Sequence, residues 1–168
     1  MLRGIDAKTA RGDDAAMVNV ADRVDLVGEI TVYVREDPPS YVSDRQRAVH
    51  EVFETLEAAG VLDPVPVVEW PEQVTSSAGE DAEPPLETYR EFVDAVGRRA
   101  LEPFFERRAA TGSTDSIVEL PAVCIALRAD GAVRGLYPCW QEGTHHSIED
   151  CIAALSRGDD IANVDPDR

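Results

Sequence analysis

The clearest chemical spacing in the chain is a pair of serines placed where a reactive thiol pair would stand. The segment "PPSYVSDRQ" (38–46) follows the apolar run "EITVYV" and precedes a helical pattern, and it holds Ser40 and Ser43 in an S-x-x-S spacing. Two cysteines at that spacing exchange disulfides through a thiolate. An unassisted serine hydroxyl cannot replace the thiolate, and the segment contains no histidine or cysteine. The residues therefore argue against thiol chemistry and leave two interpretations, a binding site or a helix cap.

The two interpretations assign different roles to the serines. Ser43 and Gln46 fit a capping box, in which the hydroxyl accepts a bond from a first-turn amide and the glutamine returns to the cap residue. Ser40 has no such structural role. A helix N-terminus also offers free amides and a positive dipole to an anion or to a peptide carbonyl. We therefore retain Ser40 and Ser43 as binding candidates.

The segment "GRRALEPFFERR" (97–108) is the densest basic stretch of the chain. Its arginines are Arg98, Arg99, Arg107 and Arg108. Guanidinium groups bind phosphate, RNA or an acidic partner, although these could equally pair with Glu102, Glu106 and the surrounding acidic surface. The adjacent Phe104 and Phe105 are either core residues or anchors for a partner.

Cysteine and histidine residues near the C-terminus have a spacing that a metal could use. The pattern C-x5-H-H-x4-C comprises Cys139, His145, His146 and Cys151. Tetrahedral zinc accepts mixed sulfur and nitrogen ligands, but the spacing matches no common zinc motif. The alternative is a solvated loop with packed cysteines, which act as small hydrophobic residues. We expect no metal or other cofactor.

Hydrophobic periodicity predicts the elements that position these residues. The expected elements are strands 28–36 and 64–70, helices 43–60 and 86–101, a hairpin of strands 116–128 and 132–138, and a final helix from 147. Asp130–Gly131 suits the hairpin turn, and Ser147 with Asp150 forms a helix start signature. Strand 64–70 is apolar enough to be buried, although Pro66 favours a sheet edge.

The remaining segments are expected to be loops or ends. Residues 71–85 are rich in serine, glycine, proline and acidic residues, which indicates a mobile loop. We expect a flexible acidic arm over 1–26, a single α/β domain over 27–157, and a frayed acidic tail over 158–168.

The order βαβαββα predicts an α/β fold, with a four-stranded mixed sheet flanked by helices. Two segments also resemble the thioredoxin and glutaredoxin-like proteins: "ITVYVREDPPSYVSDRQRAVHEVFETLEAAG" matches their opening strand, turn and helix, and "LPAVCIALRADGAVRGLYP" matches their last hairpin. The resemblance implies a thioredoxin-like fold with Ser40 and Ser43 in the cysteine places. It also implies that Pro121 is a cis-proline lying opposite them.

A second resemblance is to a haloarchaeal family of uncharacterised proteins labelled as helix-turn-helix domain proteins. It is carried by "VYVRE", "RQRAVHEVFETLEAAGVLD", "VVEWPEQV", "FFERR", "LPAVCIAL" and "LYPC". This label implies a regulator. "VFETLEAAGVLD" also resembles the helix of winged-helix DNA-binding proteins, with "LRADGAVRG" as a wing, but this chain begins with a strand where three helices would be expected.

The charge of the chain bounds its compartment and partners. It carries 33 acidic against 16 basic residues for a net charge of −17, and its only lysine is Lys8. This composition resembles that of salt-in haloarchaeal proteins, and molar salt screens the repulsion over about 3 Å. No apolar stretch approaches the roughly 20 residues of a membrane span, and we expect a cytoplasmic protein with no membrane contact. Phosphate contacts weaken steeply with salt, which disfavours DNA as a partner.

These observations favour a non-catalytic binding or regulatory module with a thioredoxin-like core that lacks the redox thiols. Its partner is expected to be another protein or a small anionic ligand. The first alternative is a helix-turn-helix, winged-helix-like transcription regulator that binds DNA. A third interpretation is an enzyme that uses the region of Ser40, Ser43 and Pro121, for example through a glutathione-transferase-like serine.

Overall fold

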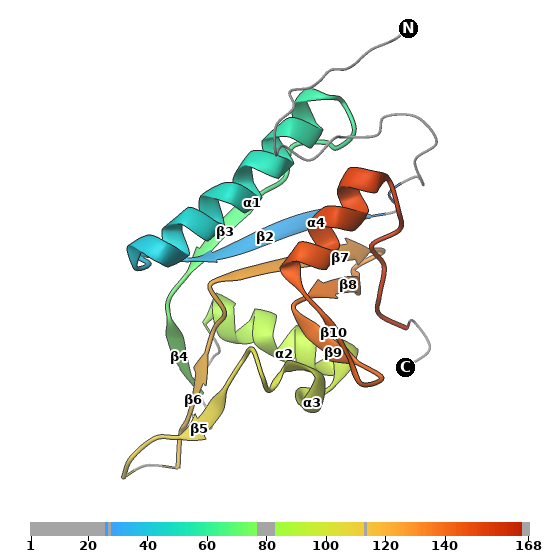
Figure 1. The fold of residues 1–168 in the computed structure, drawn as a ribbon. Helices are drawn as coiled ribbons and strands as arrows, with labels where there is room; N and C mark the ends of the chain where they lie inside the picture. The colour runs from blue at the N-terminus through green and yellow to red at the C-terminus, as the bar shows by residue number, and fades with distance from the viewer. Residues whose placement is uncertain (1–25, 27, 77–82, 113, 166–168) are drawn as a thin grey trace, which may run out of the picture.

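The computed structural model describes residues 26, 28–76, 83–112 and 114–165, and Figure 1 shows how they are arranged. All but Leu26 of the expected arm over 1–26 lies outside the described residues. The elements in chain order are β2 (Glu29–Arg35), α1 (Ser40–Ala58), β3 (Val67–Trp70), β4 (Gln73–Ser76), α2 (Pro84–Val96), α3 (Arg98–Leu101), β5 (Arg107–Ala109), β6 (Ser116–Glu119), β7 (Val123–Ala129), β8 (Ala132–Tyr137), β9 (Cys139–Gln141), β10 (Thr144–His146) and α4 (Ile148–Arg157).

The central sheet has four strands in the order β3-β2-β7-β8. Strand β2 pairs parallel with β3, and it pairs antiparallel with β7, which in turn pairs antiparallel with β8. Asp130 and Gly131 turn β7 into β8 with φ angles of 54° and 77°, as the Asp-Gly signature predicts. The expected mixed four-stranded sheet is therefore confirmed.

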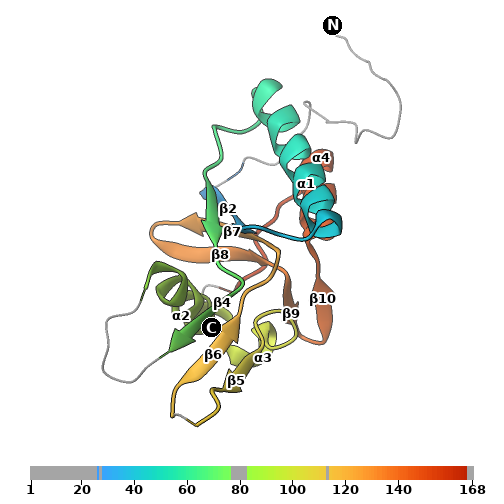
Figure 2. The same cartoon turned by 90° about the vertical axis from the view of Figure 1, so that its left-hand side faces the viewer.

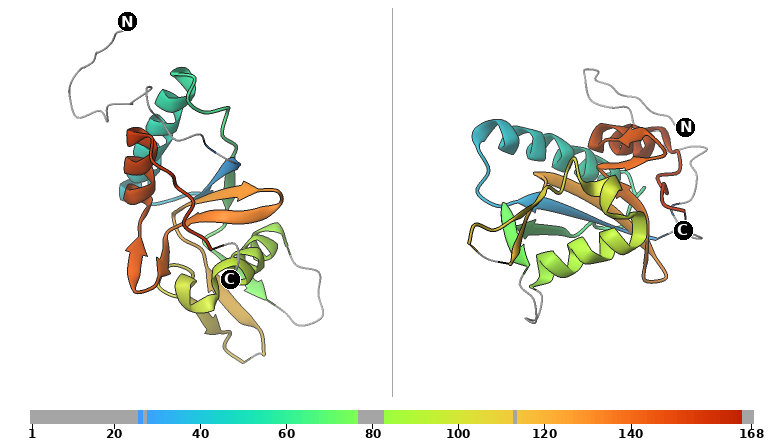
Figure 3. Two further views of the ribbon diagram at one scale, coloured as in Figure 1. Left: turned by 90° about the vertical axis from the view of Figure 1, so that its right-hand side faces the viewer. Right: turned by 90° about the horizontal axis from the view of Figure 1, so that it is seen from below.

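Helices cover both faces of this sheet because its strands are apolar on both sides. Along β7, Val123, Ile125 and Leu127 pack in one cluster with residues of α1 and α4. The alternate residues Cys124 and Ala126 pack in the other cluster with residues of α2. This alternation is the period of two expected for a strand, and the view from below in Figure 3 shows α1 and α4 on one side of the sheet and α2 on the other.

A second, three-stranded sheet was not expected from the sequence. Its order is β4-β6-β5, with antiparallel pairing throughout, and Figure 2 shows it beside α2 and α3. It uses residues 73–76 of the expected loop over 71–85, while residues 77–82 of that loop lie outside the described residues. It also divides the expected strand 116–128 into β6 and β7 on either side of Pro121, whose missing amide cannot continue a ladder.

Two further boundaries differ from the expectation. Strand β3 lies at an edge of the central sheet, and Val67 and Val68 are 48% and 42% exposed. The edge position favoured by Pro66 is therefore correct, and the prediction of a buried strand is wrong. The helix expected over 86–101 ends at Val96, because Gly97 takes a φ of 88° and separates it from the short α3.

The C-terminal segment packs against the domain, so the expected frayed tail over 158–168 is wrong for its described part, 158–165. Ile161 and Val164 are buried. The hydroxyl of Tyr137 donates to the Ile161 carbonyl at 2.6 Å, and the Val164 amide donates to the Arg134 carbonyl at 3.0 Å. The segment approaches β8 closely at Gly135, where a Cβ atom would lie 2.8 Å from the Ile161 oxygen.

Among the described residues, no helix is both long enough and apolar enough to cross a membrane.

Candidate binding sites

The two serines lie in the first turn of α1, and neither caps it. The helix begins at Ser40 with Pro39 as its N-cap residue, at φ −60° and ψ 159°, and no side chain bonds the cap. The Pro39 carbonyl accepts bonds from the Val42 and Ser43 amides at 3.0 and 2.9 Å. The capping box predicted for Ser43 and Gln46 is therefore wrong, because the helix starts a turn earlier than their spacing implies.

Gln46 instead ties the start of α1 to the central sheet. Its Nε2 atom donates to the Arg35 carbonyl at 3.1 Å and to the Ala122 carbonyl at 2.9 Å. Arg35 ends β2 and Ala122 precedes β7, so one side chain joins the helix to the ends of two strands. This tie brings α1 to Ala122, the residue that follows Pro121.

The backbone around Pro121 is occupied by bonds from within the protein. The Leu120 carbonyl accepts from the Arg35 guanidinium, and the Pro121 carbonyl accepts from Trp70 Nε1 at 3.0 Å. The Ala122 carbonyl accepts from Gln46 and also from the Arg35 amide at 3.0 Å. Three successive carbonyls are thus taken, which leaves this segment poorly suited to bind a peptide by its backbone.

The prediction that Pro121 follows a cis peptide bond is wrong. In the part of the chain that the structure describes, the cis peptide bond is the one between Tyr137 and Pro138. The resemblance located a proline before the third strand of the sheet correctly, but not its conformation.

The basic stretch is divided between different environments. Arg108 forms an ion pair with Glu119 at 2.6 Å and also contacts Gln73, as the local-pairing alternative predicts. Arg99 is exposed on α3. Arg98 and Arg107 line a cleft between α2, α3 and the small sheet, and Arg90 from α2 joins them there. Sequence reasoning missed Arg90 because only tertiary packing brings it to the other two arginines.

Of the two phenylalanines, Phe105 is a core residue and Phe104 is partly exposed. Phe105 is fully buried among the aromatic residues of one core cluster. Phe104 is half-buried and stacks on His145 with ring centroids 4.9 Å apart, while Trp140 lies 5.6 Å from the same imidazole. The hairpin of β9 and β10, which carries Trp140 and His145, was expected to be a loop.

The cysteine and histidine pattern does not assemble a metal site. Cys139 and Cys151 are buried in different core clusters, whereas His145 is exposed beside Phe104. Within the described ranges, no group of three or more histidine, cysteine, aspartate or glutamate side chains could hold a metal ion. Burial raises the pKa of the Cys139 thiol to about 11, and it also raises the pKa of Cys124 and Cys151. The packed-cysteine alternative therefore describes these residues.

Comparison with known protein families identifies a match over most of the chain. A family model described as a helix-turn-helix domain matches residues 14–160 of the chain. Neither a curated protein nor a solved structure matches it.

Proposed function

The chain belongs to the helix-turn-helix domain family, and we propose that it is a non-catalytic binding or regulatory module built on a thioredoxin-like core. Its partner is a small anionic ligand or another protein. The acidic composition, with a net charge of −17, supports a haloarchaeal, salt-rich cytoplasm as its compartment.

The arrangement of the central sheet supports the thioredoxin-like core. The first strand, β2, lies between the second, β3, and the third, β7, and the fourth, β8, lies at the far edge. The first pair is parallel, and the other two pairs are antiparallel. Helices α1 and α4 pack on one face and α2 on the other, so helices flank both faces of the mixed sheet, as expected for such a core. The small sheet of β4, β5 and β6 is then an insertion before the third strand.

The observation that carries the non-catalytic role is the junction of α1 with the Pro121 segment. Ser40 and Ser43 stand in the first helical turn where the thiol pair would be. The neighbouring carbonyls of Leu120, Pro121 and Ala122 are already bonded within the protein. A site with no thiolate and with these acceptors taken is suited to holding the fold together, and binding then takes place elsewhere.

The direct test is reduction of insulin disulfides by dithiothreitol in the presence of the protein. The wild-type protein is expected to leave the rate at its uncatalysed value, since a serine hydroxyl does not exchange disulfides. The preparation must be in molar KCl, with a thioredoxin added in parallel to show that the assay works there. Turnover above the uncatalysed rate by the wild-type protein would overturn the proposal.

The second candidate function is DNA binding, which family membership favours. Among the described residues, however, α1 and α2 are separated by β3 and β4, and α3, which follows α2, spans only Arg98–Leu101. A helix-turn-helix unit needs two helices joined by a short turn. Helix α1 also carries Glu51, Glu54 and Glu57, which would repel phosphate.

Chromatin profiling in molar KCl separates the two functions. The proposed module gives no promoter enrichment of its own, because its partner is a small anionic ligand or another protein. Specific enrichment of promoter sequences with the purified chain would favour the DNA-binding regulator over the proposed module.

A further inference from the structure

Arginines from separate elements converge on one cleft. The cleft has a volume of about 200 Å³ and lies between α2, α3 and the small sheet, which Figure 2 shows side by side. Its lining residues are Ser76, Leu86, Tyr89, Arg90, Val93, Asp94, Arg98, Arg107 and Val118. Arg90 comes from α2, Arg98 from α3 and Arg107 from β5.

Within the described residues, the arginines of the cleft lack the carboxylate partner that several other arginines have, although Arg35, Arg99 and Arg134 lack one too. Arg45 pairs with Glu149, Arg108 with Glu119 and Arg128 with Glu91. In the cleft, Arg90 contacts the Ser76 hydroxyl at 3.4 Å and Arg107 contacts the Ser116 hydroxyl at 3.1 Å. In the described part of the chain, no ion pair involves the arginines of the cleft.

An acidic protein that gathers cations in one place must offset their mutual repulsion. Asp94 is the single carboxylate in the lining, so the cleft keeps a net positive charge. An anion between the guanidinium groups would remove that repulsion and form charge-assisted hydrogen bonds. The cleft therefore has the electrostatic character of an anion site on a surface of the opposite sign.

A buried hydroxyl in the lining gives an independent indication of a ligand. Tyr89 is 3% exposed, and its hydroxyl has no hydrogen-bond partner within the described residues. Leaving a buried donor unpaired is costly, and such groups in folded proteins nearly always have a partner. The hydroxyl oxygen itself is closed to solvent, so a ligand oxygen in the cleft would bond it after a small shift of the lining.

We propose that this cleft binds the phosphoryl group of a small phosphate ester. Phosphoryl oxygens accept bonds from Arg90, Arg98 and Arg107, and one of them accepts from the Tyr89 hydroxyl. Guanidinium groups match the geometry of phosphate oxygens. The apolar residues of the lining, Leu86, Val93 and Val118, receive the carbon part of the ester.

Size and charge define the ligand further. The volume of about 200 Å³ is below the roughly 300–1,000 Å³ of sites for drug-sized ligands, which favours a small ester. The net charge of −17 repels an extended nucleic-acid backbone, whereas a single phosphoryl group contacts mainly the arginines of the cleft. This inference rests on the proposed role as a binding module, and it names the ligand class of that module.

Isothermal titration calorimetry with phenyl phosphate and inorganic phosphate tests the site, at constant KCl and ionic strength. Arg98→Gln is compared with Arg99→Gln, because the residues are adjacent on α3, both are exposed, and only Arg98 lines the cleft. Both substitutions change the net charge equally. We expect Arg98→Gln to weaken phenyl phosphate binding by about tenfold or more, as for one lost charge-assisted bond, and Arg99→Gln by less than about twofold.

Tyr89→Phe provides a second measurement that leaves the charge unchanged. It is expected to weaken phenyl phosphate binding by about threefold to tenfold through one lost hydrogen bond. Phenyl phosphate is expected to bind more tightly than inorganic phosphate, because its ring contacts the apolar lining. Circular dichroism of each variant confirms that it is folded.

Several results would overturn the proposal. The first is that neither phosphate compound binds the wild-type protein. The second is that Arg99→Gln weakens binding as much as Arg98→Gln does. The third is that a single-stranded oligonucleotide binds at the same cleft more tightly than phenyl phosphate. Failure of the insulin assay and failure of phosphate binding are distinguishable. Reductase activity would refute the non-catalytic role but not the phosphate site of the cleft. Absence of phosphate binding would refute only the phosphate site.

Discussion

Glu91→Gln removes the carboxylate that holds Arg128 between α2 and the central sheet. Arg128 Nε and Nη2 donate to Glu91 at 2.9 and 2.7 Å, and Nη2 also donates to the Tyr33 hydroxyl at 2.8 Å. The same guanidinium lies 5.8 Å from the ring centroids of both Tyr33 and Phe92. Loss of the carboxylate would leave a half-buried cation with only neutral oxygen partners, the hydroxyls of Tyr33 and Thr31, and two aromatic faces.

The magnitude follows from the exposure of the pair. Breaking a fully buried ion pair costs about 3–5 kcal/mol, and an exposed pair contributes about 0–1 kcal/mol. The side chains of Arg128 and Glu91 are 24% and 36% exposed, so the pair is intermediate. We expect Glu91→Gln to lower the free energy of unfolding by about 2 kcal/mol, and Tm by about 4–8 °C for a chain of this length.

Asp44→Asn is the matched control. Asp44 pairs with Arg47 at 3.0 Å, but these side chains are 72% and 62% exposed, so the expected cost is below about 0.5 kcal/mol. Both variants remove one negative charge from the −17 of the chain, which cancels the change in overall repulsion. Thermal and urea unfolding are followed by circular dichroism in molar KCl. Equal losses of unfolding free energy in the two variants would show that Glu91 stabilises the protein no more than an exposed ion-pair partner does.

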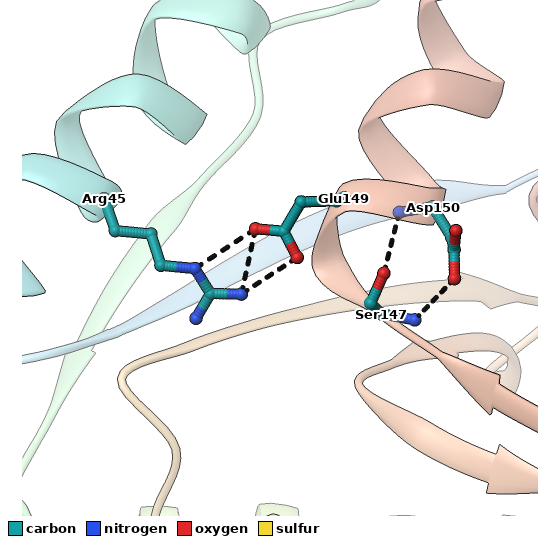
Figure 4. Close-up of polar contacts among 4 residues, drawn as sticks. All are labelled: Arg45, Ser147, Glu149 and Asp150. Atoms are coloured by element: carbon teal, nitrogen blue, oxygen red, sulfur yellow. Dashed lines mark hydrogen bonds and ion pairs between the residues drawn. The ribbon is translucent and has the colours of Figure 1, made fainter.

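Four further predictions concern the core and the starts of α1 and α4. Burial raises the pKa of all three thiols, so Cys124, Cys139 and Cys151 should not react with an aromatic disulfide reagent until the protein unfolds, and fast labelling of the native protein would contradict this. Ser147 accepts from the Asp150 amide at 3.0 Å while the Ser147 amide donates to the Asp150 carboxylate at 2.9 Å (Figure 4), so Ser147→Ala should cost about 1 kcal/mol in urea unfolding. The amide of Ser147 lowers the pKa of Asp150 below 3.8, so the stability from this carboxylate is complete above that pH and is lost as pH falls through the lowered folded-state pKa. The difference in free energy of unfolding between wild type and Asp150→Asn should therefore shrink in that range. A difference that stays constant would contradict the role of Asp150 as the capping carboxylate. Gln46→Met keeps the length of the side chain but removes both donated bonds, and it should lower the free energy of unfolding by about 1–3 kcal/mol; an unchanged midpoint would show that Gln46 does not tie α1 to the sheet.

The elements of the central sheet could be predicted because their signals are local. The Asp-Gly turn, the capping box at Ser147 and the apolar stripe of α1 each depend on residues a few positions apart. The small sheet was missed because its strands have only three or four residues, and because β4 pairs with β6 across a long sequence separation although β5 and β6 form a local hairpin. The packed C-terminal segment was missed because its acidic composition hides Ile161 and Val164, which only the surface of β8 makes buried.

The binding sites depend even more on tertiary structure. The resemblance to thioredoxin-like proteins implied that Pro121 lies opposite Ser40 and Ser43, but neither it nor the residue pattern indicated that Arg35, Trp70 and Gln46 occupy the carbonyls of residues 120–122. The sequence identified Arg98 and Arg107 as basic residues of one stretch, but their grouping with Arg90 depends on how α2 packs on the small sheet. The unpartnered hydroxyl of Tyr89 has no sequence signal at all, because its position on the apolar face of α2 resembles that of any core tyrosine.

The most direct test of the central claim is the disulfide equilibrium of a Ser40→Cys/Ser43→Cys variant in glutathione buffer. If these serines stand in the place of a redox pair, the new thiols form an intramolecular disulfide with a potential of about −200 to −270 mV, the range of glutaredoxins and thioredoxin. The control is Arg47→Cys/His50→Cys, with the same spacing in the interior of α1. In the interior of the helix, closing Cβ atoms from about 5–6 Å to the roughly 3.5–4.5 Å of a disulfide breaks helical hydrogen bonds on both sides of the pair. Ser40 is instead the first residue of α1, where the amides of the first turn have no intrahelical acceptors and the backbone can adjust at lower cost. We predict that the first-turn pair oxidises in that range while the control pair stays reduced. A first-turn pair that stays reduced like the control would show that Ser40 and Ser43 do not stand in the place of a redox pair.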